Sequence, residues 1–217
     1  MTKNEQLNRL FDEWINKFPH YKGKFKKDGI INEDTYNEQN TKILFISKEP
    51  NDVNQEEGDY RVWWRSEVKW TFSYRIAEWA YGILKNQLPP SDINNLSKVD
   101  RIDAMKKIAF MNLKKVGGGA SVNYDVLKRT IITEKDLIVK EIKIIEPDII
   151  IGSIGQFEFW NHLFGDKLNE QTVYGCKVFR NSHYKVVHYF HPSYRVPRAM
   201  SYSLLQNIIH SEIFKKL

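Results

Sequence analysis

The sequence predicts an α/β fold, a three-layer α/β/α sandwich around a central sheet of four parallel strands. Short apolar runs alternate with amphipathic segments of helical period, which is typical of a parallel sheet covered on both faces. Each apolar run ends at a polar loop, as in open α/β sheets that hold their sites at strand ends. The 217 residues are enough for one sizeable core, so we expect a single domain over residues 1–217.

The N-terminal part of the chain begins with a helix over residues 5–18, where large apolar side chains recur at helical spacing before a proline. Residues 19–40 are polar and rich in lysine and glycine, so we expect residues 1–40 to be a helix and a basic loop packed on the domain. The apolar run 42–47 predicts a buried strand. Residues 48–68 are long and irregular, and loops of this kind often carry function.

The middle of the chain starts with a helix over residues 70–84, which places apolar residues on one side. After a Pro-Pro break, a short helix is expected between 91 and 102, followed by the second strand at 107–112. Two helical patterns, 122–131 and 134–145, lead toward the third strand. Their inward positions are apolar, so both are expected to cover the sheet.

The C-terminal part repeats the alternation of strand and helix. Residues 148–152 predict the third buried strand and residues 155–164 a helix. Residues 172–180 alternate in polarity and predict a short strand. The fourth buried strand is expected at 184–190, and the closing helix at 200–215.

Composition limits the partners that this chain can have. Lys and Arg number 33 against 27 Asp and Glu, a net charge of +6 that is compatible with a phosphate backbone. No apolar run approaches the roughly 18 residues that span a bilayer, and the first residues have no apolar signal core, so we expect a cytoplasmic protein without a membrane partner. We also expect a monomer.

No cofactor is expected from the sequence. Cys176 is the single cysteine, which excludes an internal disulfide and an all-cysteine metal or cluster site. The histidines lack the spacing of metal ligands. The glycines at 117–119 match neither GxGxxG nor a Walker loop, so no nucleotide cofactor is assigned.

Polar side chains gather where three of the expected strands end. The first strand leads into Lys48-Glu49-Pro50-Asn51-Asp52, the second ends at Asn112, and the fourth leads into His191-Pro192-Ser193-Tyr194-Arg195. The carboxyl ends of parallel strands meet at one edge of a sheet, so a carboxylate, an amide and an imidazole can converge there. Such a set suits the breaking of a bond to a nucleobase, and the basic charge suits a nucleic-acid substrate.

Four segments occur in the order in which the uracil-DNA glycosylase superfamily has them, and the chain resembles that family over residues 42–195. These segments are Lys48-Glu49-Pro50-Asn51, Asn112 after a strand, the Pro-Asp-Ile-Ile-Ile-Gly run 147–152, and His191-Pro192-Ser193. The resemblance implies a central four-stranded parallel sheet flanked by helices. It also implies an enzyme that flips a base out of DNA and cleaves its N-glycosidic bond without a metal or organic cofactor.

The resemblance assigns roles to individual residues. Glu49 matches the acidic residue that activates water, Asn112 the amide that reads the edge of the flipped base, and His191 the donor that stabilises the departing base. The residues after Ser193 match the loop that enters the DNA stack. We therefore expect DNA contacts from that loop and from nearby basic residues: Tyr194, Arg195, Val196, Arg198 and Lys115.

The first motif departs from the family pattern, Gly-Gln-Asp-Pro-Tyr, whose tyrosine excludes groups at the 5-position of a pyrimidine. Asn51 stands there in this chain, so the substrate is either uracil or a 5-modified pyrimidine, including a modified base of phage DNA. DNA repair and antiviral defence are the corresponding roles. The base is expected to lie among Lys48, Pro50, Asn51, Asp52, Trp64, Phe72, Lys114 and Ser193, with Phe72 as the stacking aromatic.

Each of these assignments has an alternative. Glu49 can be a solvated loop acid with Asp52 as the rival carboxylate, Asn112 can cap a turn, and His191 can be a structural histidine. A lysine, Lys48 or Lys114, could give a Schiff-base lyase. At the level of the whole protein, the alternative to a monofunctional glycosylase is a non-catalytic nucleic-acid-binding module on the same fold.

Overall fold

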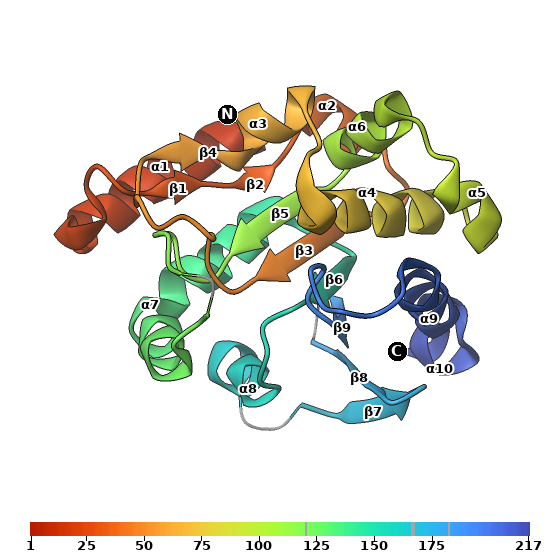
Figure 1. The fold of residues 1–217 in the computed structure, drawn as a ribbon. Coiled ribbons are helices and arrows are strands. Elements are labelled where there is room, and N and C mark those ends of the chain that lie inside the picture. The colour runs from red at the N-terminus through yellow and green to blue at the C-terminus, as the bar shows by residue number, and fades with distance from the viewer. Residues whose placement is uncertain (120, 166–167, 182) are drawn as a thin grey trace.

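The computed structural model describes residues 1–119, 121–165, 168–181 and 183–217, and it has an α/β fold built on a mixed sheet of seven strands (Figure 1). From one edge to the other, the strands are β2 (Gly29–Ile30), β5 (Ala109–Asn112), β3 (Ile43–Ser47), β6 (Ile149–Gly152), β9 (Lys185–His188), β8 (Cys176–Arg180) and β7 (Glu170–Val173). Neighbours in the series β5, β3, β6 and β9 pair in parallel. The strands β2, β8 and β7 pair antiparallel to their neighbours.

The sheet therefore differs from the four-stranded parallel sheet expected from the sequence. The strand β2 has two residues, one of them a glycine, and lies in the segment 19–40 that was expected to be a loop. Residues 172–180 were expected to be one strand, but a turn at Tyr174 and Gly175 folds this region into the hairpin of β7 and β8. Both turn residues have positive φ, 48° and 80°, which reverses the chain direction there.

Helices cover both faces of the sheet (Figure 1). One face carries α1 (Lys3–Lys17), α7 (Tyr124–Ile145) and α8 (Glu158–Phe164). The other carries α3 (Tyr60–Ser66), α4 (Trp70–Leu84), α5 (Pro90–Asn94), α6 (Lys98–Lys106), α9 (Arg198–His210) and α10 (Glu212–Lys216). The remaining short elements are a 3-10 turn at Pro19–Tyr21, α2 (Glu33–Asn37), and the paired strands β1 (Lys26–Lys27) and β4 (Gly58–Asp59).

Local signals explain most of these elements. Thr2 caps α1 and forms a capping box with Glu5, and a proline follows the helix end. All five residues of β3 are buried, as expected of a strand covered on both faces. In the described residues no helix has the length and apolar character needed to cross a membrane.

Two predicted helices, 122–131 and 134–145, are one helix, α7. Neither glycine nor proline lies between the two patterns, so no residue there breaks the helix. The junction also packs against α1: Glu134 is buried and accepts hydrogen bonds from Trp14 Nε1 at 2.6 Å and from the Tyr21 hydroxyl at 3.0 Å. Tertiary packing thus stabilises the helix across the expected break.

Candidate functional site

An open cleft of about 980 Å³ lies at the carboxyl ends of the parallel strands. The segments that follow three of these strands contribute to its wall, with Lys48, Glu49, Asn51, Asn112, His191, Ser193 and Tyr194. The rest of the wall comes from α3, the start of α4 and the segment before α7, with Tyr60, Trp64, Lys69, Trp70, Thr71, Phe72, Ser73, Gly119 and Val122. The cleft thus joins segments that are more than 140 positions apart in the sequence.

Sheet topology places the three expected catalytic residues around this cleft. The strands β5 and β3 are neighbours, with Asn112 paired to Ser47, so Asn112 and the Lys48-Glu49 segment adjoin each other. His191 follows β9, which is separated from β3 by β6 alone. Glu49, Asn112 and His191 all line the same cleft.

Glu49 is held by an ion pair under the cleft surface. Its side chain is 7 % exposed, and Lys114 Nζ lies 2.6 Å from Oε2. Gly118 packs against the carboxylate so closely that a Cβ at this glycine would lie 2.4 Å from Oε1. The carboxylate therefore occupies one defined position, and Glu49 is not a solvated loop acid.

Asn112 lines the cleft, and its side-chain donor is buried near the Tyr60 hydroxyl. The residue is 1 % exposed, and its Nδ2 has no hydrogen-bond partner among the described residues. Its backbone N–H donates to Asp28 Oδ2 at 2.7 Å, which fixes the end of β5. A buried amide without a partner is costly in a folded protein. A ligand in the cleft that accepts this hydrogen bond would remove that cost.

His191 is a neutral histidine with a defined tautomer. The Ser193 N–H donates to Nδ1 at 3.3 Å, so Nε2 carries the hydrogen of the neutral ring. Burial, and secondarily the nearby Lys48 ammonium, lowers the pKa of His191 to about 4. At neutral pH the ring is therefore an uncharged hydrogen-bond donor.

An aromatic wall borders the imidazole. Phe72 lies 5.2 Å from the His191 ring between centroids, and it packs against Trp64 and Phe110. Trp64 is 7 % exposed and makes closer contacts with Phe110 and Tyr60, so most of its ring belongs to the core. Phe72 is half-buried and is the aromatic of this group whose placement fits stacking on a ligand.

Lys115 was expected to contact DNA, and the structure contradicts this. Its side chain is fully buried, with Nζ 2.6 Å from Asp28 Oδ1 and 2.7 Å from Glu141 Oε2. Burial alone would lower the pKa of Lys115, but the two carboxylates raise it above its usual value. Burial raises the pKa of Glu141 well above its usual value. Lys115 is a buried partner of these acids and cannot reach a phosphate.

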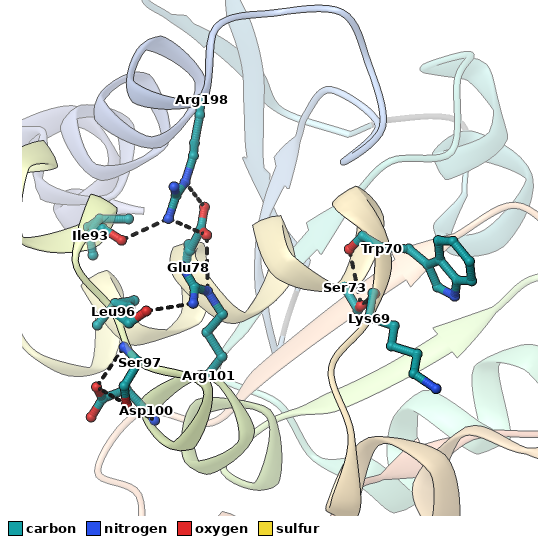
Figure 2. Close-up of polar contacts among 10 residues, drawn as sticks. All are labelled: Lys69, Trp70, Ser73, Glu78, Ile93, Leu96, Ser97, Asp100, Arg101 and Arg198. Atoms are coloured by element: carbon teal, nitrogen blue, oxygen red, sulfur yellow. Dashed lines mark hydrogen bonds and ion pairs between the residues drawn. The ribbon is translucent and has the colours of Figure 1, made fainter.

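Arg198 was also expected to bind DNA; its side chain is 35 % exposed, and its guanidinium is engaged in an ion pair with a buried carboxylate. Its guanidinium lies 2.6 Å from Glu78 Oε1, donates to Oε2 at 2.7 Å, and donates to the Ile93 carbonyl at 2.8 Å. Arg101 approaches the same carboxylate from α6 at 3.4 Å. Figure 2 shows both arginines converging on Glu78, which is 2 % exposed. Arg198 thus fastens α9 to α4.

Three expected substrate-binding residues, Pro50, Asp52 and Lys114, do not line the cleft. Lys114 instead pairs with Glu49. Asp52 pairs with Lys26 Nζ at 2.6 Å and accepts hydrogen bonds from the N–H groups of Asn54 and Glu56. These contacts, of which the hydrogen bond with Lys26 has the largest effect, lower the pKa of Asp52 and stabilise its negative charge. Asp52 therefore organises its own loop, and Glu49 is the carboxylate in the cleft.

The segment after Ser193 is braced at the mouth of the cleft. Tyr194 is 59 % exposed and stacks on Phe190, with ring centroids 5.9 Å apart and planes at 10°. Arg75 of α4 donates to the Tyr194 carbonyl at 2.9 Å and to the Val196 carbonyl at 2.7 Å. Arg195 is exposed next to Tyr194.

In the part of the cleft wall that α3 and the start of α4 supply, the sequence predicted Trp64 and Phe72 but not Tyr60, Lys69, Trp70 and Thr71. Burial raises the pKa of Tyr60, whose hydroxyl lies near the Asn112 amide. The density of aromatic residues between 59 and 72 was the available signal. It could not show which rings face the core and which face the cleft.

A smaller hollow of about 330 Å³ lies at the other end of the parallel strands. Its basic side chains already have partners: Lys185 Nζ donates to the Phe214 and Lys215 carbonyls, and Arg180 donates to the Leu217 carbonyl. Within the described parts of the chain, no three His, Cys, Asp or Glu side chains are grouped to hold a metal ion. The large cleft is therefore the candidate functional site.

No model of a known protein family matches the chain, and no curated protein matches its sequence.

Proposed function

We propose that the protein is a monofunctional DNA glycosylase, which accepts a flipped pyrimidine nucleotide in the cleft and hydrolyses its N-glycosidic bond to leave an abasic site. The observation that carries the proposal is the meeting of Glu49, Asn112 and His191 in one cleft beside Phe72. In this proposal the protein acts as a cytoplasmic monomer, with DNA as its partner and without a cofactor.

The proposed chemistry follows from the charges that develop as the bond breaks. The bond between C1′ and the base nitrogen breaks with its electron pair on the base, so the sugar becomes positive and the base negative. The Glu49 carboxylate stabilises the sugar and orients a water molecule, whose oxygen bonds to C1′ while its proton passes to Glu49 and then to the released base anion. The neutral His191 donates a hydrogen bond from Nε2 to the departing base anion and keeps its own proton.

A base is a planar ring with a polar edge, and in this proposal different residues recognise its edge and its face. Asn112 Nδ2 donates to an acceptor on that edge, and Phe72 stacks on its face. Stacking of this kind contributes about 1–3 kcal/mol per base. Lys48 has no carboxylate partner within the described residues. Its ammonium lies near His191 and adds positive charge where the departing base becomes negative.

The identity of the base is proposed from Asn51, which is exposed and lines the cleft where the family pattern has a tyrosine. A smaller side chain leaves room beside the 5-position of a pyrimidine. We therefore propose uracil or a 5-modified pyrimidine as substrate, with roles in DNA repair or in defence against phages whose DNA carries such a base.

A non-catalytic nucleic-acid-binding module is the second candidate, and the ion pair between Glu49 and Lys114 favours it. A carboxylate neutralised at 2.6 Å is less available to a developing cation or to water. The glycosylase proposal therefore requires Glu49 to retain enough negative charge toward the sugar while Lys114 holds it in place.

A substrate panel tests the proposal. Purified protein is incubated with duplex and single-stranded DNA containing uracil, a thymine mismatch or a 5-modified cytosine, and abasic sites are detected by alkaline cleavage. Product with at least one base is expected, formed about a hundredfold or more slowly by His191→Ala. Binding without product on any base would support the non-catalytic module. Covalent trapping by borohydride would instead indicate a lyase through Lys48 or Lys114.

A further inference from the structure

Trp70 stands free at the mouth of the cleft. Its side chain is 79 % exposed, and it is the first residue of α4 and part of the cleft wall. Figure 2 shows the indole extending away from the start of the helix. Among the described residues, no aromatic ring or cation contacts this indole, whereas Trp14, Trp79 and Trp160 are buried in the core.

The backbone conformation at Trp70 is energetically unfavourable. Trp70 has φ 66°, in the left-handed region that a bulky residue rarely adopts and that costs about 1 kcal/mol or more. The Ser73 hydroxyl fastens the turn by donating to the carbonyls of Lys69 and, at 3.3 Å, of Trp70. Core packing gains nothing from this arrangement, because the indole buries little of its surface.

A second exposed aromatic residue, Tyr194, is tied to α4 as well. Arg75, also on α4, holds the carbonyls of Tyr194 and Val196, so the segment that carries Tyr194 is tied to the helix that carries Trp70. Both rings line the cleft. The two aromatic residues are therefore held in a fixed relation to each other at the cleft.

We propose that Trp70 is the stacking platform for the nucleobase that adjoins the flipped nucleotide in the DNA strand. Flipping leaves that neighbour with one face unstacked, and an exposed indole offers a flat apolar surface for it. Any base has such a face, so the contact strengthens binding without reading sequence. The inference rests on the proposed function in taking DNA as the ligand, but it does not depend on bond cleavage.

The test uses a probe that contains no cleavable base at the centre. Short single-stranded DNAs carry a tetrahydrofuran abasic analogue at the central position, and the neighbouring nucleotide on either side is adenine or a second analogue. Dissociation constants are measured by fluorescence anisotropy. We expect removal of one neighbouring adenine to weaken binding by wild type about tenfold, within the range of about 5- to 150-fold that one stacked base supplies.

The variants separate stacking from a general loss of structure. Trp70→Ala should bind the intact probe about tenfold more weakly and lose nothing further when the neighbouring adenine is removed. Trp70→Phe should retain most of the sensitivity to that adenine. Tyr174→Ala is the matched control, since Tyr174 is 65 % exposed, has φ 48° and lies at the distant β7–β8 turn. It should behave as wild type.

The outcomes distinguish this inference from the proposed function. Equal sensitivity to the adjoining adenine in wild type and Trp70→Ala would overturn the inference, even if abasic product forms on the substrate panel. Coupling between Trp70 and that adenine, with no product on any base, would support the inference and refute the glycosylase. Absence of DNA binding by wild type would overturn both.

Discussion

The Glu49 carboxylate is positioned by two contacts that the residues themselves explain. Lys114 provides an opposite charge at 2.6 Å, and Gly118 provides room for the oxygens because it lacks a Cβ. A methyl group at position 118 would have to displace the end of the Glu49 side chain, which is flexible, so the fold can survive while the carboxylate moves. The geometry of the carboxylate therefore depends on one glycine.

We predict that Gly118→Ala lowers the rate of base release by about tenfold or more, since misplacing a catalytic group has effects of that order. The unfolding free energy should change little by comparison. Gly119→Ala is the matched control, because a Cβ there would meet nothing within 4 Å. Single-turnover kinetics and urea unfolding of both variants provide the measurement. A rate of base release by Gly118→Ala equal to that of wild type would show that the position of the carboxylate does not matter.

His191 gives a prediction about pH. Its folded pKa is about 4 because burial and Lys48 oppose its charge, whereas an unfolded histidine has a pKa of about 6.5. Between these values the unfolded chain binds the extra proton, so the unfolding free energy should fall as pH decreases from about 6.5 to about 4. His191→Gln should reduce this dependence in urea unfolding measured over that pH range.

The dependence should be reduced rather than abolished by that substitution. Burial also lowers the pKa of His188 and His210, and both contribute with the same sign. A pH dependence identical in wild type and His191→Gln would mean that the imidazole is not held neutral in the cleft.

At the residue scale, the sequence could identify the candidate side chains but not their partners. Glu49, Asn112 and His191 follow apolar runs, a pattern visible without a structure. Nothing in the pattern distinguishes Lys114, which meets Glu49, from Lys115, which turns into the core. The two lysines follow the end of β5 at a bend and take different directions, so one meets Glu49 and the other is buried with Asp28 and Glu141.

At the element scale, a buried charge network joins the end of β5 to α7. Lys115 bridges Asp28 and Glu141, and Asp28 also accepts the hydrogen bond from the Asn112 N–H. The network therefore supports the strand end that carries Asn112. Removal of the lysine would leave Asp28 buried without its cation.

We predict that Lys115→Met lowers the unfolding free energy by about 3–5 kcal/mol, the usual cost of removing one partner of a buried ion pair. Urea unfolding checks this, with the exposed Lys24→Met as the control that should change little. A direct role in DNA binding would give the opposite pattern, with weaker DNA affinity and an unchanged unfolding free energy.

The elements that the sequence predicted well have strong local signals, and those it missed have weak ones. The helices α1 and α4 and the strands β3 and β6 agree with the expected ranges to within a few residues, because their apolar periodicity is clear. The two-residue strands β1, β2 and β4 show no such period. Their formation depends on pairing with distant segments, such as Gly29 with Phe110.

At the scale of the whole molecule, the fold brings distant segments together by the order of its strands. The order β5, β3, β6 and β9 places the segments after residues 47, 112 and 188 at one end of the sheet. The alternation of strands and helices predicts the α/β class but not the strand order or the antiparallel additions. The strand order and the antiparallel strands depend on contacts between residues that are far apart in the sequence, which a local pattern cannot predict.

The central claim is that Glu49 acts on a nucleotide bound in the cleft. The most direct test compares wild type and Glu49→Gln, which keeps the shape of the side chain, in single-turnover abasic-site formation and in binding to tetrahydrofuran-containing DNA. The account predicts a rate lower by about a hundredfold or more with nearly unchanged affinity, since a charge that stabilises the transition state would be lost. Equal rates of base release in the two proteins would contradict it.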